Sequence, residues 1–251
     1  MEKLGFIGLG IMGLPIARHL CEAGYEVLVN DVNSTACAAA QQFGACPADI
    51  REIGESCDVI FMILPNGGIV QQVLFEAGLA EFLQPGSLVV DMSSVTPEES
   101  RQCAQRLAQK QVDFLDAPVS GGEPGAKAGT LALMVGGEES AFERAKPYFE
   151  AIGSSAMRIG PAGSGSVTKL ANQIIVNLNI AAVSEALVLA AKAGADPALV
   201  YEAIRGGLAG SQVLDAKAPM MLHRDFQPGG KISINHKDIK NVMASAHALD
   251  V

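Results

Sequence analysis

A lysine and two amides stand near the start of the longest apolar segment of this chain. Lys169, Asn172 and Gln173 lie within GSGSVTKLANQIIVNLNIAAVSEALVLAAKAG, residues 163–194. Residues three and four apart on a helix share one face, so the ammonium and an amide are expected on the same side. An ammonium can donate a proton or stabilise developing negative charge. The alternative is a lysine whose stem covers apolar surface while its charge stays in water.

A second group of residues could bind a carboxylate. The segment DAPVSGG, residues 116–122, runs from an apolar strand end into Ser120, Gly121 and Gly122. Two successive glycines beside a hydroxyl can present backbone N–H groups to an anion. A plain turn explains the same residues. If this turn lies next to Lys169, a binding site is favoured over a plain turn, because a proton donor would then stand beside the bound carboxylate.

A glycine motif, GLGIMG, follows the first predicted strand and opens a helix. In such a motif Gly8 permits a tight turn, Gly10 lets the backbone approach a pyrophosphate, and Gly13 allows the helix to pack closely on the strand. N–H groups at the helix start would hold the phosphates, even in an acidic chain. The predicted dinucleotide site is formed by Gly8, Leu9, Gly10, Ile11, Met12 and Gly13.

Asn30 and Asp31 end the second predicted strand, about twenty residues after the glycine motif. A carboxylate at this point accepts hydrogen bonds from a ribose 2′-OH and repels a 2′-phosphate, and Val32 follows in place of an arginine. NAD(H) is therefore favoured as cofactor, with NADP(H) as the alternative. The other interpretation is that Asp31 caps the next helix.

Charge and composition limit the partners. The chain has 251 residues, of which 49% are hydrophobic and 18% charged, and its formal net charge is −9. Nucleic acid and anionic membrane surfaces require clustered Lys and Arg, so neither is expected as a partner. The apolar stretch 170–193 carries amides and charges that would be costly in lipid. We predict no membrane span there, and a buried helix of a soluble protein.

Cysteine and histidine usage points to a reducing compartment without metal chemistry. The five cysteines are odd in number and contain no CxxC pair, so we expect buried thiols and no disulfide framework. The start KLGFIG is strand-like and does not resemble a signal peptide, which favours the cytoplasm. The four histidines lack the spacing of metal ligands, and no metal site is predicted.

Alternation of apolar runs and helical patterns predicts the fold. Near-continuous apolar strands separated by helices indicate a parallel sheet covered on both faces. Thr96 and Pro97 carry the signal for a helix start, as N-cap and first helical residue. We predict an α/β fold: a Rossmann-type, doubly wound, mostly parallel sheet in residues 1–162, followed by an all-α domain in residues 163–251. The strand predictions are 4–8, 26–31, 58–64, 87–93, 112–118, 131–137 and 155–160.

Several segments together resemble the β-hydroxyacid dehydrogenase family. They are GFIGLGIMG, the LPN turn at 64–66, DMSS at 91–94, DAPVSGG, KLANQ at 169–173 and HKD at 236–238. The resemblance covers nearly the whole chain. Members of the family continue for some tens of residues more, so this chain is expected to stop inside the helical domain.

The resemblance implies an NAD(P)-dependent oxidoreductase that acts on a small carboxylate semialdehyde or 3-hydroxy acid. Lys169 would be the catalytic residue, Ser120, Gly121 and Gly122 would anchor the substrate carboxylate, and Asn172 and Gln173 would orient the substrate. Many relatives have asparagine where Gln173 stands, so which amide takes that role stays open. Cofactor contacts implied by the resemblance are Leu64, Pro65, Asn66, Ser94, Thr96 and Lys237.

The same resemblance ranks the substrates and alternatives. Tartronate semialdehyde, reduced to D-glycerate, leads, and 3-hydroxyisobutyrate and other semialdehydes follow. The related 6-phosphogluconate dehydrogenases have glutamate seven residues after the lysine, whereas Val176 stands here, which argues against decarboxylation. A non-catalytic dinucleotide-binding protein would be expected to lack the lysine. The long apolar helix and the pair Met220 and Met221 suggest helix exchange between subunits of a homo-oligomer.

Overall fold

The computed structural model describes residues 2–227 and 231–251, which divide into two compact units. The first, the sheet unit, runs to Leu170 and includes Met243–Val251. The second, the helical unit, is Ala171–Val242. Two helices contribute residues to both units: α9 (Ser164–Lys192) and α12 (Ile232–Ala248).

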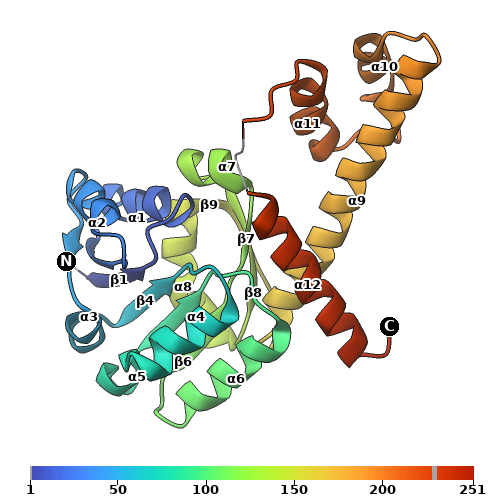
Figure 1. The fold of residues 1–251 in the computed structure, drawn as a ribbon. Helices are drawn as coiled ribbons and strands as arrows, with labels where there is room; N and C mark the ends of the chain where they lie inside the picture. Colours follow the sequence, from blue (N-terminus) through green and yellow to red (C-terminus); the bar gives the residue numbers. More distant parts are fainter. Residues whose placement is uncertain (1, 228–230) are drawn as a thin grey trace. The chain divides into compact units, whose positions relative to one another are not determined.

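The sheet unit is built on one sheet of mainly parallel strands (Figure 1). Its strands are β1 (Lys3–Ile7), β2 (Glu26–Asn30), β3 (Cys46–Pro47), β4 (Val59–Met62), β5 (Leu88–Asp91), β6 (Asp113–Asp116), β7 (Val119–Ser120), β8 (Leu131–Gly136) and β9 (Gly153–Gly160). Over the described residues their order is β3-β2-β1-β4-β5-β6-β8-β7, with β9 also paired to β8. Strands β1 to β6 pair in parallel, whereas β8 is antiparallel to β6 and β7. Because β1 lies between β2 and β4, the order reverses at β1, and ligands bind at such switch points in open α/β sheets.

Helices cover both faces of this sheet (Figure 1). They are α1 (Gly13–Glu22), α2 (Ser34–Gln41), α3 (Ile50–Ser56), α4 (Gly67–Gln71) with its π-helical continuation η1 (Gln72–Glu76), α5 (Leu79–Phe82), α6 (Pro97–Ala108), α7 (Gly122–Ala128) and α8 (Glu139–Ile152). Successive strand residues point to opposite faces. Phe6 accordingly packs in the core that contains α1 and α8, and Ile7 in the core that contains α3 and α6. The predicted doubly wound α/β fold is confirmed.

Only helices are found among the described residues of the helical unit. It combines parts of α9 and α12 with α10 (Pro197–Ile204) and α11 (Gln212–Leu222). Its core is small and consists of Leu187, Tyr201, Leu214 and Ala218. A mainly apolar hollow of about 440 Å³ lies between α9, the segment after α10 and the start of α11, and no charged side chain lines it. The hollow therefore offers no group for acid–base chemistry.

The prediction that the long apolar segment is a buried helix was wrong for the single chain. Helix α9 has the predicted extent, but only 6% of its most apolar 18-residue window is buried. Ile175 is 62% exposed and Leu178 is 65% exposed. By length and composition alone this helix could cross a membrane, but one such helix is weak evidence of a membrane protein. The apolar pattern correctly predicted a helix; it did not reveal which surface covers it.

Candidate active site

The glycine turn after β1 has the geometry of a phosphate-binding loop. Gly8 adopts φ +100°, which only glycine tolerates easily, and a Cβ on Gly13 would lie 1.8 Å from the carbonyl oxygen of Gly8. A Cβ on Gly10 would meet nothing within 4 Å, so that side of the turn is open. Helix α1 begins at Gly13 with no side-chain cap on its N–H groups. An open turn and uncapped donors at a helix start fit a dinucleotide pyrophosphate. Leu9, Ile11 and Met12 complete this turn.

Asp31 is tied to the glycine turn. Its carboxylate accepts hydrogen bonds from Leu9 N at 2.6 Å and from Asn33 N at 2.7 Å. Helix α2 is capped by Asn33, which accepts from Thr35 N, so the alternative that Asp31 is the cap was wrong. Each oxygen of Asp31 takes one N–H, and a carboxylate has capacity for further donors such as a ribose hydroxyl.

Asn30 and Val32, on either side of Asp31, complete the carboxyl end of β2. Asn30 donates from Nδ2 to Ala48 O at 2.7 Å, and its carbonyl accepts from Gly8 N at 2.9 Å. Asn30 therefore joins β2 to the glycine turn through its backbone. The side chain of Val32 is fully exposed, which is unusual for an apolar residue.

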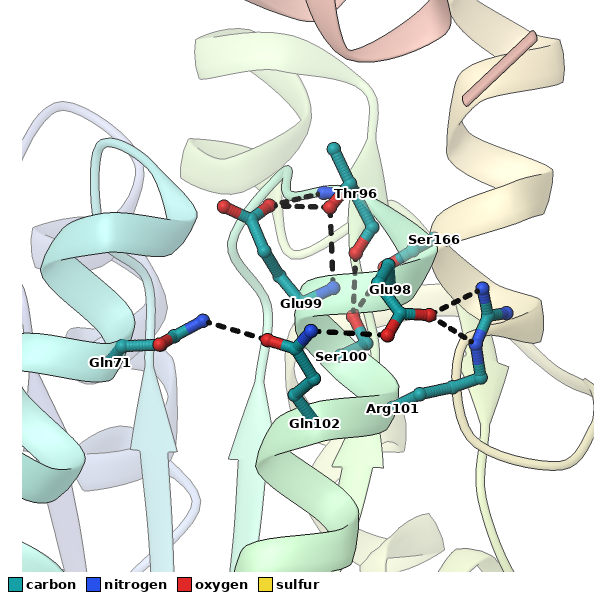
Figure 2. Close-up of polar contacts among 8 residues, drawn as sticks. All are labelled: Gln71, Thr96, Glu98, Glu99, Ser100, Arg101, Gln102 and Ser166. Carbon is teal, nitrogen blue, oxygen red and sulfur yellow. Dashed lines mark hydrogen bonds and ion pairs between the residues drawn. The ribbon is translucent and has the colours of Figure 1, made fainter. Parts of the chain in front are cut away.

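Two residues expected to contact the cofactor serve as helix caps. Asn66 accepts from Ile69 N at the start of α4. Thr96 forms a capping box with Glu99 at the start of α6: its N–H and hydroxyl each donate to Glu99 Oε2 at 2.8 Å (Figure 2). Pro65 and Ser94 lie in the loops that follow β4 and β5, beside these caps. A cofactor contact at Thr96 or Asn66 would have to be compatible with its role as a cap.

The buried aspartate Asp91, which was not predicted as a site residue, fixes the turn that begins at Leu64. Leu64 N donates to Ser93 Oγ at 2.8 Å, and Asp91 accepts from Ser93 N at 3.0 Å and from the Ser93 hydroxyl. Burial raises the pKa of Asp91 to about 6, the charges of Asp116 and Glu99 act in the same direction, and the hydrogen bonds from Ser93 oppose the shift. The signal in the sequence was an aspartate ending an apolar strand, in DMSS.

Lys169 lies beside the glycine turn that follows β7. Its Nζ donates to the carbonyl oxygen of Val119 at 2.8 Å, and Val119 directly precedes Ser120. Gly121 and Gly122 have φ of +135° and +60°, so two successive residues of the turn adopt backbone conformations that favour glycine. The partly buried Lys169 and the predicted carboxylate-binding turn are therefore neighbours within the sheet unit.

The predicted residues of the helical unit form one polar network. Asn172 Nδ2 donates to Gln173 Oε1 at 2.9 Å, and Gln173 Nε2 donates to Asp238 Oδ2 at 2.5 Å. Lys237 Nζ lies 3.0 Å from Asp238 Oδ1. Gln173 and Asp238 are 6% and 2% exposed, so the network is buried at its centre. Asp238 was missed, although the HKD segment that contains it was noted.

One thiol and one histidine contact the segments that carry these residues: Cys37 Sγ donates to Asp31 O at 3.6 Å, and His19 Nε2 lies 3.0 Å from Lys127 O in α7. In the described ranges, no group of three or more His, Cys, Asp or Glu side chains is placed to hold a metal ion. The five cysteines are free thiols. The expectation of buried thiols holds for Cys57 and Cys103 alone: Cys21 and Cys37 are only partly buried, and Cys46 is exposed on the short edge strand β3. Burial raises the pKa of Cys57 and of Cys103 to about 12, so neither is a ready nucleophile.

Comparison with known proteins identifies the family. The sequence model of the NAD-binding domain of 6-phosphogluconate dehydrogenase matches residues 3–160. The model described as NAD-binding of NADP-dependent 3-hydroxyisobutyrate dehydrogenase matches residues 163–251. The 2-hydroxy-3-oxopropionate reductase of Escherichia coli (strain K12) is 46% identical over 248 residues, which are 98% of this chain and 85% of that protein. The chain belongs to the β-hydroxyacid dehydrogenase family.

Other members of this family are similar along the whole chain. The L-threonate dehydrogenase of Escherichia coli (strain K12) is 34% identical over 250 residues, covering 98% of this chain and 83% of the relative. The structure of Mycobacterium tuberculosis 3-hydroxyisobutyrate dehydrogenase with L-serine superposes with a TM-score of 0.92 at 30% identity, covering 100% of this chain and 88% of that one. The family comprises NAD-dependent 3-hydroxyacid dehydrogenases, so the protein is an oxidoreductase with an NAD(P)-binding domain.

Proposed function

We propose that the protein reduces tartronate semialdehyde, which is 2-hydroxy-3-oxopropionate, to D-glycerate, with NADH favoured over NADPH. The observation that carries the proposal is the hydrogen bond from Lys169 Nζ to Val119 O, which holds an ammonium beside Ser120, Gly121 and Gly122. The substrate is chosen because the E. coli relative of that name is 46% identical to this chain over 248 residues.

Each group of residues has its own role in the proposed hydride transfer. A dinucleotide held by the glycine turn of residues 8–13 would supply the hydride in the reducing direction. Ser120, Gly121 and Gly122 bind the substrate carboxylate through backbone N–H groups and the hydroxyl. The Lys169 ammonium stabilises the negative charge that develops on the carbonyl oxygen and donates its proton to that oxygen. In the oxidising direction the neutral amine accepts the proton from the alcohol.

The polar network of the helical unit would orient the substrate and cofactor. Gln173 is buried between Asn172 and Asp238, and Asp238 is paired with Lys237. We infer that Gln173 acts chiefly by holding Asn172 and Asp238, and that Asn172 is the amide that meets the substrate. Lys237 would contact the cofactor.

The preference for NADH rests on the end of β2. Asp31 would accept a hydrogen bond from the ribose 2′-OH, and its charge would repel a 2′-phosphate. Val32, fully exposed, offers no cation to hold that phosphate. NADPH remains the alternative, since one matching family model is named for an NADP-dependent enzyme.

A panel of substrates tests the proposal. Initial rates are measured for oxidation of D-glycerate, 3-hydroxyisobutyrate and L-threonate, and for reduction of tartronate semialdehyde, each with NAD(H) and NADP(H). The proposal predicts the highest kcat/KM for the tartronate semialdehyde and D-glycerate pair with NAD(H), by about tenfold or more, since differences in pocket contacts separate small substrates on this scale. A higher value for 3-hydroxyisobutyrate or L-threonate would replace the substrate and keep the reaction class.

A non-catalytic dinucleotide-binding protein is the alternative of another class. It would bind NADH with no turnover on any member of the panel. The presence of Lys169 beside the glycine turn favours the enzyme.

We also propose that the protein is a cytoplasmic homo-oligomer in which the exposed apolar face of α9 is covered by another copy. The support is that this face exposes Ile175 and Leu178 in the single chain, and surfaces of this kind mark interaction sites. The net charge of −9 and the five free thiols are consistent with a reducing, soluble environment.

A further inference from the structure

Asp116 is a buried carboxylate to which the proposed reaction gives no role. It ends β6 and is 1% exposed. Gly163 N donates to its Oδ1 at 2.7 Å, and Ser166 N donates to its Oδ2 at 2.7 Å. The Ser166 hydroxyl is a further donor to the same carboxylate. Both oxygens are therefore used to bind the first turn of α9, where a negative charge is favourable.

The start of α9 is fitted closely to the sheet around this carboxylate. A Cβ on Gly165 would lie 2.3 Å from Met134 O and 2.4 Å from Asp116 O, so only glycine allows the helix to approach these strands. Ser166 Oγ lies 2.9 Å from Ser100 Oγ in α6 (Figure 2). The first turn of α9 is thereby fixed against β6, β8 and α6 within the sheet unit.

Lys169 follows this turn directly. Its Nζ reaches Val119 O at 2.8 Å, three residues beyond Asp116 on the same stretch of chain. One short segment, residues 116–122, therefore holds the start of the helix that carries the lysine, accepts a hydrogen bond from the lysine, and forms the glycine turn. A shift of the helix relative to Asp116 would move the ammonium relative to that turn.

We propose that Asp116 is a positioning residue for Lys169. By binding the N–H groups of Gly163 and Ser166, its carboxylate sets where the ammonium lies beside Ser120, Gly121 and Gly122. This inference rests on the proposed function of Lys169. The negative charge of Asp116 also offsets the positive end of the α9 dipole, which would otherwise disfavour an ammonium nearby. Asp91 on β5 is close enough for its pKa to be raised by the charge of Asp116, and Arg101 on α6 lies against Gly163.

The test compares substitutions that separate charge from position. Asp116→Asn keeps the size of the side chain but removes the charge and one of the two acceptor oxygens. Gly165→Ala displaces the helix start and leaves Asp116 intact. Asp113→Asn is the matched control, because it changes an exposed aspartate at the other end of β6. For each variant we would measure kcat across pH, the Kd for NADH by fluorescence, and thermal unfolding.

For Asp116→Asn we expect kcat to fall about 10- to 100-fold, since displacement of a catalytic group by about 1 Å has effects of this size. NADH affinity should stay near the wild-type value, and the basic limb of the kcat profile should move to lower pH because a nearby negative charge is lost. Gly165→Ala should lower kcat without moving that limb. Asp113→Asn should behave as wild type.

A folded Asp116→Asn protein with wild-type kcat and pH profile would overturn the inference. If that variant does not fold, Ser166→Ala decides: it removes one donor to Asp116 and keeps the backbone N–H. We expect a several-fold lower kcat with unchanged NADH affinity, and an unchanged kcat would overturn the inference. Wild-type turnover in Lys169→Ala would instead reject the proposed function, so the two failures are distinguishable.

Discussion

At the scale of single residues, two buried aspartates stand side by side at the carboxyl ends of neighbouring strands. Asp91 and Asp116 are register partners on the parallel strands β5 and β6, and both are 1% exposed. Their hydrogen-bond partners differ. Asp91 accepts from Ser93, whose hydroxyl in turn accepts from Leu64 N, whereas Asp116 accepts from residues at the start of α9. Burial raises the pKa of each carboxyl. Ionisation of either carboxyl is therefore less favourable in the folded state than in the unfolded state.

Asp91 should make stability fall as pH rises. Its pKa is raised from 3.8 to about 6, so the folded state holds a proton that the unfolded state has released between these values. The stability that this proton contributes is fully present below 3.8 and is lost as pH rises through about 6. Asp91→Asn lacks this titration. The free energy of unfolding of the variant, relative to wild type, should rise by up to about 3 kcal/mol between about pH 4 and pH 7.

Urea unfolding of wild type and Asp91→Asn over this pH range measures the difference. Asp113→Asn, with its exposed carboxyl, serves as the control and should track wild type. A difference between Asp91→Asn and wild type that does not change with pH would show that Asp91 is not protonated on folding.

Residue types and spacing predicted part of this site. Lys169, Ser120 and the glycines beside it were found because a lysine near amides and a double glycine are unusual in apolar surroundings. The roles of Asp91 and Asp116 could not be found in this way. An aspartate that ends a strand has no assigned partner until the segment that closes over it is known, and the partners of Asp116 lie 47 and 50 residues away.

At the scale of elements, the start of α6 is fixed by its capping box. Thr96 accepts from Glu99 N and donates to Glu99 Oε2. Thr96→Ala should lower the free energy of unfolding by about 1 kcal/mol, the usual effect of losing such a cap. Thr96→Ser keeps the hydroxyl and should retain nearly all of the stability. Chemical unfolding of the three proteins measures this, and equal stability of the alanine variant would mean that the cap is not needed.

Elements with strong local signals were predicted well, and short ones were not. The capping signal of α6 and the apolar runs of β1, β2, β4 and β5 appear in the structure at nearly the expected residues. Strands β3 and β7 have two residues each, too few to show an alternating pattern. Helix α7, GEPGAKA, contains two glycines and a proline, so its sequence favours a turn, and the helix forms only in the context of the fold.

At the scale of the whole molecule, α9 exposes an apolar face, and we propose that another copy of the chain covers it. We expect the wild-type protein to have a mass in solution of at least twice the 26.0 kDa of one chain. Replacing both Ile175 and Leu178 by Glu should weaken association, because two charges would be buried in an apolar contact. Light scattering after size exclusion measures the mass. Met157→Glu on β9, an exposed apolar residue of the sheet unit, is the control. A monomeric wild-type protein would contradict the proposal.

We propose above all that the ammonium of Lys169 serves the reaction as proton donor beside the substrate. The most direct measurement is kcat for tartronate semialdehyde reduction in Lys169→Ala, together with the Kd for NADH, with the exposed Lys146→Ala as control. We predict that kcat falls by about 100-fold or more in Lys169→Ala, the usual contribution of a general acid, while NADH affinity and the control stay near wild type. Turnover of Lys169→Ala at the wild-type rate would contradict the account.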